Sequence, residues 1–253
     1  MLRFAIKSDK RVMYIPIERR NLERNLQIIY KTLGVTLEEL GKYLVIVEYD
    51  DNFDDMVEYL TSGKNFKNVM SVIFDSATEI MDTDLTLELS EQANEARDPE
   101  DRKEKSLFKQ VKLSQEGYGA LAGNMIRLMR IFGNLSKRGK YVIIISRLDE
   151  NPKWDRELSA APMLKGKEFS KSFAGKCDFI GLVEPRVNEE QHIVYPPKVS
   201  FVSNGSYLAK WTGKYPLRKG KEQEPRNMPL DLELILGTDD VPNKSKTAKE
   251  GKV

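Results

Sequence analysis

The sequence predicts an α/β fold with a mostly parallel central sheet flanked by helices, and antiparallel strands at one edge near the C-terminus. Short apolar runs alternate with segments of helical periodicity, which is the pattern of strands joined by helical crossovers. One run, YVIII at 141–145, lacks polar alternation, as strands covered on both faces do. After residue 177, short apolar runs and turn residues follow closely, which predicts the antiparallel strands.

Four apolar runs are expected to form the central strands, at residues 11–17, 43–47, 69–74 and 141–145. Helices are expected between them, at residues 21–33, 51–60 and 115–137, where apolar side chains recur every three or four positions. The C-terminal third is expected to add short strands at residues 177–183, 192–195, 198–202 and 207–211. Pro196-Pro197 and Asn204-Gly205 are expected to be turns between them.

These elements are expected to form one domain over residues 1–236, with an acidic helical insertion at about 77–111. Residues 237–253 are polar and rich in lysine, so we expect a disordered tail.

Composition excludes several classes of protein. No run of about 18 apolar residues is present, so no membrane span is expected. The N-terminus lacks the apolar core of a secretory signal, and Cys177 is the only cysteine, which points to a reducing cytoplasm. His192 is the only histidine, and no His/Cys cluster suggests zinc.

Charge is segregated along a chain whose formal net charge is only +2. Basic residues outnumber acidic ones at 1–31 and 198–226, and acidic residues dominate 75–104. Such asymmetry can steer a polyanion to one side of a protein. Solvated faces that serve only solubility explain it equally well.

Two acids follow apolar strands. Asp75 comes directly after VMSVIF, and Glu18 follows VMYIPI. Ligands of open α/β sheets bind at the carboxyl ends of the strands. An Asp there can hold Mg²⁺, and a Glu can orient an attacking water as a general base. The alternative for each is a structural role, and for Asp75 this is the N-cap of the next helix.

The series VMYIPIE, VIFDS, a long amphipathic helix and YVIIIS resembles the core of RecA-family ATPases. More narrowly, it is similar to RecA-like recombination ATPases of bacteriophages, the Sak-type single-strand annealing group, over about residues 1–215. The resemblance implies Glu18 as catalytic residue, Asp75 with Ser76 at Mg²⁺, and Ser146 with Arg147 at the nucleotide-sensing position. RecA-type proteins usually carry a polar residue such as Gln there, so Arg147 departs from the pattern.

The resemblance further implies ATP and Mg²⁺ as cofactors, bound between subunits of a ring or filament. It implies annealing of single-stranded DNA in recombination, with a single-strand-binding protein as a possible partner, in the host cytoplasm if the protein is phage-encoded.

Candidate DNA contacts are basic residues in two stretches. The segment PMLKGKEFSKSFAGKCDFIGLV resembles a DNA-contacting loop and the strand after it. Basic side chains neutralise phosphates, and aromatic ones stack on bases. The candidates are Lys165, Lys167, Lys171, Lys176, Lys210 and Lys214. An ordinary solvated loop is the alternative.

The phosphate-binding loop GxxxxGK[ST] of such ATPases is absent from the 253 residues. No Gly-Lys pair is followed by Ser or Thr; four of the pairs, for example, are followed by Tyr43, Asn65, Glu168 and Cys177. The loop is expected immediately before residue 1, because MLRFA reads as the helix after it. Three explanations of its absence remain open: the loop is encoded upstream, is supplied by another polypeptide, or is lost.

The functional alternatives are a non-catalytic DNA-binding or assembly protein, and a RecA-fold subunit of a helicase or replication complex.

Overall fold

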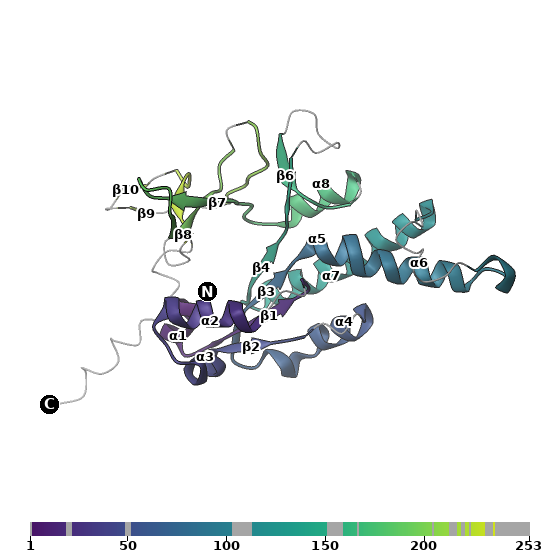
Figure 1. Cartoon of the computed structure of the whole chain (residues 1–253), viewed down its shortest axis with the longest axis horizontal. Helices are drawn as coiled ribbons and strands as arrows, with labels where there is room; N and C mark the ends of the chain where they lie inside the picture. The colour runs from purple at the N-terminus through teal and green to yellow at the C-terminus, as the bar shows by residue number, and fades with distance from the viewer. Residues whose placement is uncertain are drawn as a thin grey trace.

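The computed structural model describes residues 2–18, 22–48, 52–102, 113–150, 159–165, 167–203, 205–212, 217–218, 221–222, 224–230 and 235. Its centre is a four-stranded sheet in the order β2–β1–β3–β4 (Figure 1). The strands are β1 (Arg11–Pro16), β2 (Leu44–Ile46), β3 (Val69–Asp75) and β4 (Tyr141–Ile145). All three neighbouring pairs are parallel, as the sequence predicts.

Helices cover both faces of this sheet. They are α1 (Leu2–Ser8), α2 (Leu22–Leu33), α3 (Leu37–Tyr43), α4 (Phe53–Thr61), α5 (Ala77–Glu79), α6 (Leu85–Glu95), α7 (Gln115–Lys137) and α8 (Lys167–Lys176). One π-helical turn, Ile80–Asp84, joins α5 to α6, and a 3₁₀ turn follows at Pro99–Asp101. Residues 77–95 are therefore helical, and residues 103–111 of the expected insertion lie outside the described residues. None of the described helices has the length and apolar character needed to span a membrane.

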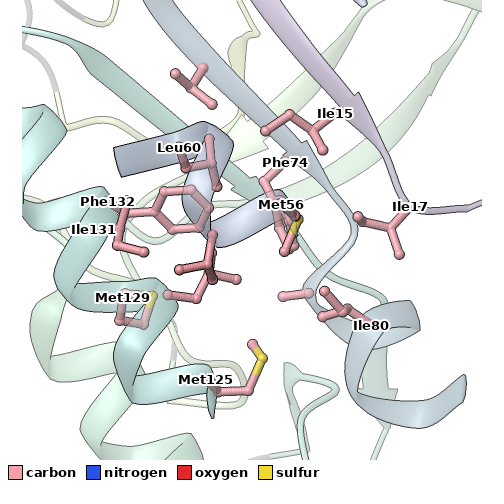
Figure 2. Packing of buried hydrophobic residues seen from close by; sticks show 14 of the residues in the cluster. Ile15, Ile17, Met56, Leu60, Phe74, Ile80, Met125, Met129, Ile131 and Phe132 are labelled. Carbon is pink, nitrogen blue, oxygen red and sulfur yellow. The ribbon is translucent and has the colours of Figure 1, made fainter. Parts of the chain in front are cut away.

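The main core lies between the sheet and helices α4 and α7, on what we call the α7 face (Figure 2). The apolar stripe expected on α7 is buried there: Leu121, Met125, Leu128, Met129, Phe132 and Leu135. Phe74 of β3 meets Phe132 edge to face, with ring centroids 5.3 Å apart. Burial of a side chain of this size contributes about 1.5–3 kcal/mol, so this face provides most of the driving force for folding.

A smaller cluster covers the opposite side, which we call the α1 face. Ala5 of α1, Val12 of β1 and Met70 of β3 are buried together there, with Ile73 and Tyr141 packed against them. Helix α3 packs beside α1 and contacts β1 and β2. It begins with a capping box, in which Thr36 and Glu39 satisfy each other's backbone N–H groups.

The C-terminal part adds antiparallel strands, as predicted, but among the described residues they form sheets of their own and do not extend an edge of the central sheet. A three-stranded sheet has the order β11–β8–β7, and two hairpin-like pairs, β5–β6 and β9–β10, accompany it (Figure 1). The strands are β5 (Leu148–Glu150), β6 (Ala160–Pro162), β7 (Leu182–Val187), β8 (Ile193–Ser200), β9 (Leu217–Arg218), β10 (Lys221–Glu222) and β11 (Met228–Pro229).

The expected turn at Pro196-Pro197 is wrong, because β8 continues through both prolines. Proline fixes φ in a range that extended backbone tolerates, but it removes a donor from the ladder. The pairing with β7 is irregular between Glu184 and Arg186, opposite this part of β8. A bulge at this point accommodates the missing donors. The predicted tail at 237–253 lies outside the described residues.

Candidate functional site

The two acids after the apolar strands lie together at the carboxyl edge of the sheet. Strands β1 and β3 are neighbours, and Pro16 is in register with Asp75. Beyond the strand, the backbone N–H groups of Ile17 and Glu18 both donate to the carbonyl of Asp75, at 2.6 and 3.2 Å. This pairing fixes Glu18 beside Asp75, as expected for the ends of adjacent parallel strands.

Tyr14 holds the carboxylate of Asp75. Its hydroxyl donates to Asp75 Oδ2 at 2.8 Å, from β1 to β3 across the sheet. Side chains alternate along a strand, so Tyr14 and Pro16 share one face of β1, the face next to Asp75. The hydrogen bond orients the carboxylate of Asp75.

Ser76 links the second acid to the helix that follows. Its hydroxyl donates to Glu18 Oε1 at 3.1 Å and accepts the backbone N–H of Glu79 at 3.2 Å. Ser76 is therefore the N-cap of α5. The sequence left open that Asp75 serves only as the N-cap of this helix. Because Ser76 is the N-cap, capping does not explain the carboxylate of Asp75.

Arg147 closes the site from the end of β4. Its Nε lies 3.3 Å from Glu18 Oε1, and a terminal nitrogen of its guanidinium pairs with Glu79 Oε2. Its backbone N–H donates to Thr78 Oγ1 at 2.9 Å. Partial desolvation acts to lower the pKa of Arg147, but the carboxylates of Glu18 and Glu79 outweigh it and raise that pKa.

The residue at the expected sensor position thus contacts the expected catalytic glutamate. Only 8% of the Glu18 side chain is exposed, whereas 47% of Arg147 is exposed, so the guanidinium lies between the acid and solvent. Ser146 precedes it and is half-buried. This arrangement fixes the orientation of Glu18 and leaves Arg147 reachable by an anionic ligand.

The donor set is compatible with Mg²⁺ held with a nucleotide. Mg²⁺ keeps several waters and binds through one or two carboxylates together with substrate phosphates. Asp75 provides such a carboxylate at the strand end. Among the described residues, no group of three or more His, Cys, Asp or Glu side chains forms a metal cluster.

Of the six candidate DNA-binding lysines, the structure describes the side chains of three, Lys165, Lys176 and Lys210. Lys165 Nζ contacts Thr86 Oγ1 at 3.0 Å and Asp82 Oδ1 at 3.5 Å, beside α6. Lys210 Nζ donates to the carbonyl oxygens of Cys177 and Gly175, at 2.6 and 3.2 Å, at the end of α8. Lys176 is exposed nearby. Lys214 and the side chains of Lys167 and Lys171 lie outside the described part of the chain.

Sequence reasoning missed three residues of the site: Tyr14, Thr78 and Glu79. Tyr14 had a usable signal, because period-2 alternation places it on the strand face that flanks Asp75. Glu79 lies three residues after Ser76, which is the spacing of a capping motif. Thr78 carried no signal of its own, because its partner, the backbone N–H of Arg147, is 69 positions away.

Comparisons with known proteins give little beyond this geometry. No family model and no curated protein matches the chain. Among solved structures, it is similar to a KaiC-like protein, PH0186, from the hyperthermophilic archaeon Pyrococcus horikoshii OT3. The identity is 14% and the TM-score 0.40, over 79% of this chain and 67% of that one. At this level the likeness carries no functional inference.

Proposed function

We propose that the chain is the body of a RecA-like ATPase that binds Mg²⁺-ATP at the carboxyl edge of its parallel sheet. The observation that carries the proposal is the placement of Asp75 and Glu18 at the carboxyl ends of the neighbouring strands β3 and β1, each held by a specific partner. Asp75 is oriented by Tyr14, and Glu18 by Ser76 and Arg147. Ligands of open α/β sheets bind at this edge, and the two carboxylates have different partners there, so they suit different roles in binding and hydrolysing a nucleotide.

In this proposal Asp75 binds the hydrated Mg²⁺ that accompanies the phosphates of ATP. Mg²⁺ would draw charge from the γ-phosphate, as in nucleotide hydrolysis generally. Glu18 orients the attacking water and accepts its proton. Arg147 faces solvent on one side of Glu18, so a bound phosphate would compete with Glu18 for the guanidinium. Release of Glu18 by that competition would make its carboxylate available to the water.

Equilibrium binding tests the nucleotide site. ATP is titrated into the protein as its gene encodes it, with Mg²⁺ and with excess EDTA, for wild type, Asp75→Asn and Asp54→Asn. Asp54 is a matched control, because its carboxylate is exposed on α4 and pairs with Arg127. We expect Mg²⁺-dependent binding that Asp75→Asn weakens about tenfold or more, the loss of about 1.4 kcal/mol. Equal affinity in all three proteins would remove Asp75 from the site, and no binding would favour the non-catalytic alternative.

Single-stranded DNA is the partner that we propose for this ATPase, with annealing as the outcome. The exposed position of Lys176 supports a phosphate contact, whereas Lys165 and Lys210 already satisfy groups within the chain. The test is the fluorescence anisotropy of a labelled oligonucleotide at several salt concentrations. Lys176→Ala should weaken binding and reduce the salt slope by about 0.7, the value for one contact to a single strand. An unchanged slope would remove Lys176 from the interface.

A further inference from the structure

Basic residues gather at the amino-terminal edge of the central sheet, which we call the amino edge. It consists of the segments that lead into the four parallel strands, residues 7–11, 42–43, 64–68 and 137–140. These segments contain nine Lys and Arg residues and one acid, Asp9, whereas the whole chain is nearly balanced, with 41 basic and 39 acidic residues. Because parallel strands all begin at one edge, segments far apart in the sequence bring their positive charges to one surface.

Hydrogen bonds hold neighbouring segments of the amino edge against each other. The backbone N–H of Arg11 donates to the carbonyl of Asn68 at 2.8 Å, and Arg11 Nε donates to the carbonyl of Lys42 at 3.2 Å. On the other side of β3, Lys140 Nζ donates to the carbonyl of Val69, the first residue of that strand. The four strand starts therefore form one continuous surface.

Some cations of the amino edge are explained by the helices that end there. Lys7, Lys42 and Lys137 lie in the last turns of α1, α3 and α7, where the negative end of the helix dipole stabilises a cation. Lys10 and Lys67 lie outside the α-helices, and both are exposed. Neither forms an ion pair with an acid in the part of the chain that the structure describes. No contact within that part accounts for these two charges.

The positive charges of the amino edge act on one another. Lys140 is half-buried, and burial lowers the pKa of its ammonium. The positive charge of Lys10 lowers that pKa further. An anion bound at this edge would relieve the repulsion, because a nearby negative charge favours the charged form of an ammonium. The amino edge is therefore a surface on which anions are favoured.

The size of the amino edge suits the phosphate backbone of a nucleic acid. Neighbouring strands lie about 4.8 Å apart, so the four strand starts span about 14 Å. Phosphates recur about every 3.4 Å along the axis on each strand of a duplex, so about four of them fit this width. The aromatic residues of the amino edge, Tyr43 and Phe66, are half-buried and buried. Neither is an exposed platform of the kind on which unpaired bases stack.

The amino edge is separate from the candidate nucleotide site. Glu18 and Asp75 lie at the carboxyl ends of β1 and β3, and β3 has seven residues. With a rise of about 3.3 Å per residue, the two edges of the sheet are about 20 Å apart. A ligand of the amino edge therefore does not need ATP at Asp75.

We propose that the amino edge binds the phosphate backbone of double-stranded DNA, without reading its sequence. Lys10 and Lys67 contact phosphates directly, and the other cations of the edge add to the attraction. Duplex DNA carries one charge per about 1.7 Å of its axis, twice the density of either of its strands. Its bases are paired and need no stacking partner from the protein. The duplex lies on the side of the sheet opposite the proposed ATP site.

Fluorescence anisotropy of a labelled DNA duplex, measured with the full chain at several salt concentrations, tests the proposal. Wild type is compared with the double variants Lys10→Ala/Lys67→Ala and Lys10→Arg/Lys67→Arg. The matched control is Arg97→Ala/Arg102→Ala, which also removes two exposed positive charges, from the region that follows α6. Lys10→Ala/Lys67→Ala should lower the slope of log affinity against log salt by about 1.8, the value for two duplex contacts. The other two variants should keep the wild-type slope.

A second titration uses one strand of the same duplex, which should bind more weakly than the duplex. Absence of duplex binding by wild type, an equal loss of slope in the control, or tighter binding of the single strand would overturn the proposal. Variants Lys10→Ala/Lys67→Ala and wild type should bind ATP equally. Duplex binding that follows the expected slopes in a protein that binds no ATP would support the amino edge and contradict the proposed function.

Discussion

The hydroxyl of Tyr14 donates to Asp75 Oδ2 at 2.8 Å and joins β1 to β3 at the candidate site. Loss of this bond in Tyr14→Phe removes a charge-assisted interaction at a partly buried position. We expect the free energy of unfolding to fall by about 1.5–3 kcal/mol. Urea denaturation measures this change. Tyr59→Phe is the control, because Tyr59 is partly buried against the main core and its hydroxyl has no hydrogen bond among the described residues. A similar loss of unfolding free energy in both variants would mean that the Tyr14–Asp75 hydrogen bond does not stabilise the protein.

The substitution Arg147→Lys tests whether the planar guanidinium of Arg147 is needed at the site. Its Nε and terminal nitrogen contact two different carboxylates, which a lysine ammonium cannot match in the same geometry. Because the pairs are partly exposed, Arg147→Lys should change stability by less than about 1 kcal/mol. Hydrolysis of ATP should fall much further, by about tenfold, if the fork positions Glu18. A large loss of stability with unchanged hydrolysis would make Arg147 a structural residue only.

Glu88 of α6 should make stability dependent on pH. Its Oε2 is buried without a hydrogen-bond partner among the described residues. Burial raises the pKa of Glu88 above 4.5, and the charge of Asp54 raises it further. With the folded pKa above the unfolded one, the stabilisation is present at acid pH and is lost as pH rises through the folded pKa.

Glu88→Gln removes this titration. We expect the variant to be more stable than wild type at pH 7 and to lose that advantage as pH falls, because Glu88 of the folded wild type binds a proton at higher pH than Glu88 of the unfolded chain. Thermal unfolding of both proteins between pH 4 and 7 measures the difference. A constant difference in melting temperature over that range would contradict the assignment.

Gly181 allows close packing in the C-terminal sheet. A Cβ at this position would lie 2.7 Å from Val199 Cγ2 and 2.8 Å from Phe201 Cε1, and both of these side chains are buried. Gly181→Ala should therefore destabilise the protein by about 1–3 kcal/mol. Gly175→Ala is the matched control, since a Cβ there meets nothing within 4 Å and Gly175 lies in a helix. Equal stability of the two variants in urea would contradict the close packing.

Much of the fold could be predicted because the spacing of apolar residues along the sequence distinguishes helices from strands. Helix α7 and strand β4 have the predicted bounds, because an uninterrupted apolar stripe and an uninterrupted apolar run leave little ambiguity. The sequence placed Glu18 and Asp75 at equivalent strand ends, and the structure adds that their strands β1 and β3 are neighbours. Helix α3 was missed although its capping box, Thr36 and Glu39, is visible in the sequence.

The remainder depended on contacts between distant positions. The sequence places Arg147 after β4, but its choice of Glu18 and Glu79 as partners depends on how the end of β4 meets the start of α5. The contacts of Lys165 with Asp82 and of Lys210 with the carbonyl oxygen of Cys177 could not be predicted either, because a basic composition does not show which side chains have partners within the fold. The continuation of β8 through two prolines likewise depends on an irregular pairing in its neighbour β7.

The most direct test of the central claim is ATP hydrolysis by the protein as its gene encodes it, with Mg²⁺ and single-stranded DNA present. Wild type is compared with Glu18→Gln, and with Asp54→Asn as a remote control. We expect Glu18→Gln to lower kcat by about 100-fold or more, the contribution typical of a general base, and Asp54→Asn to leave it unchanged. Hydrolysis by Glu18→Gln at the wild-type rate would show that Glu18 is not the general base.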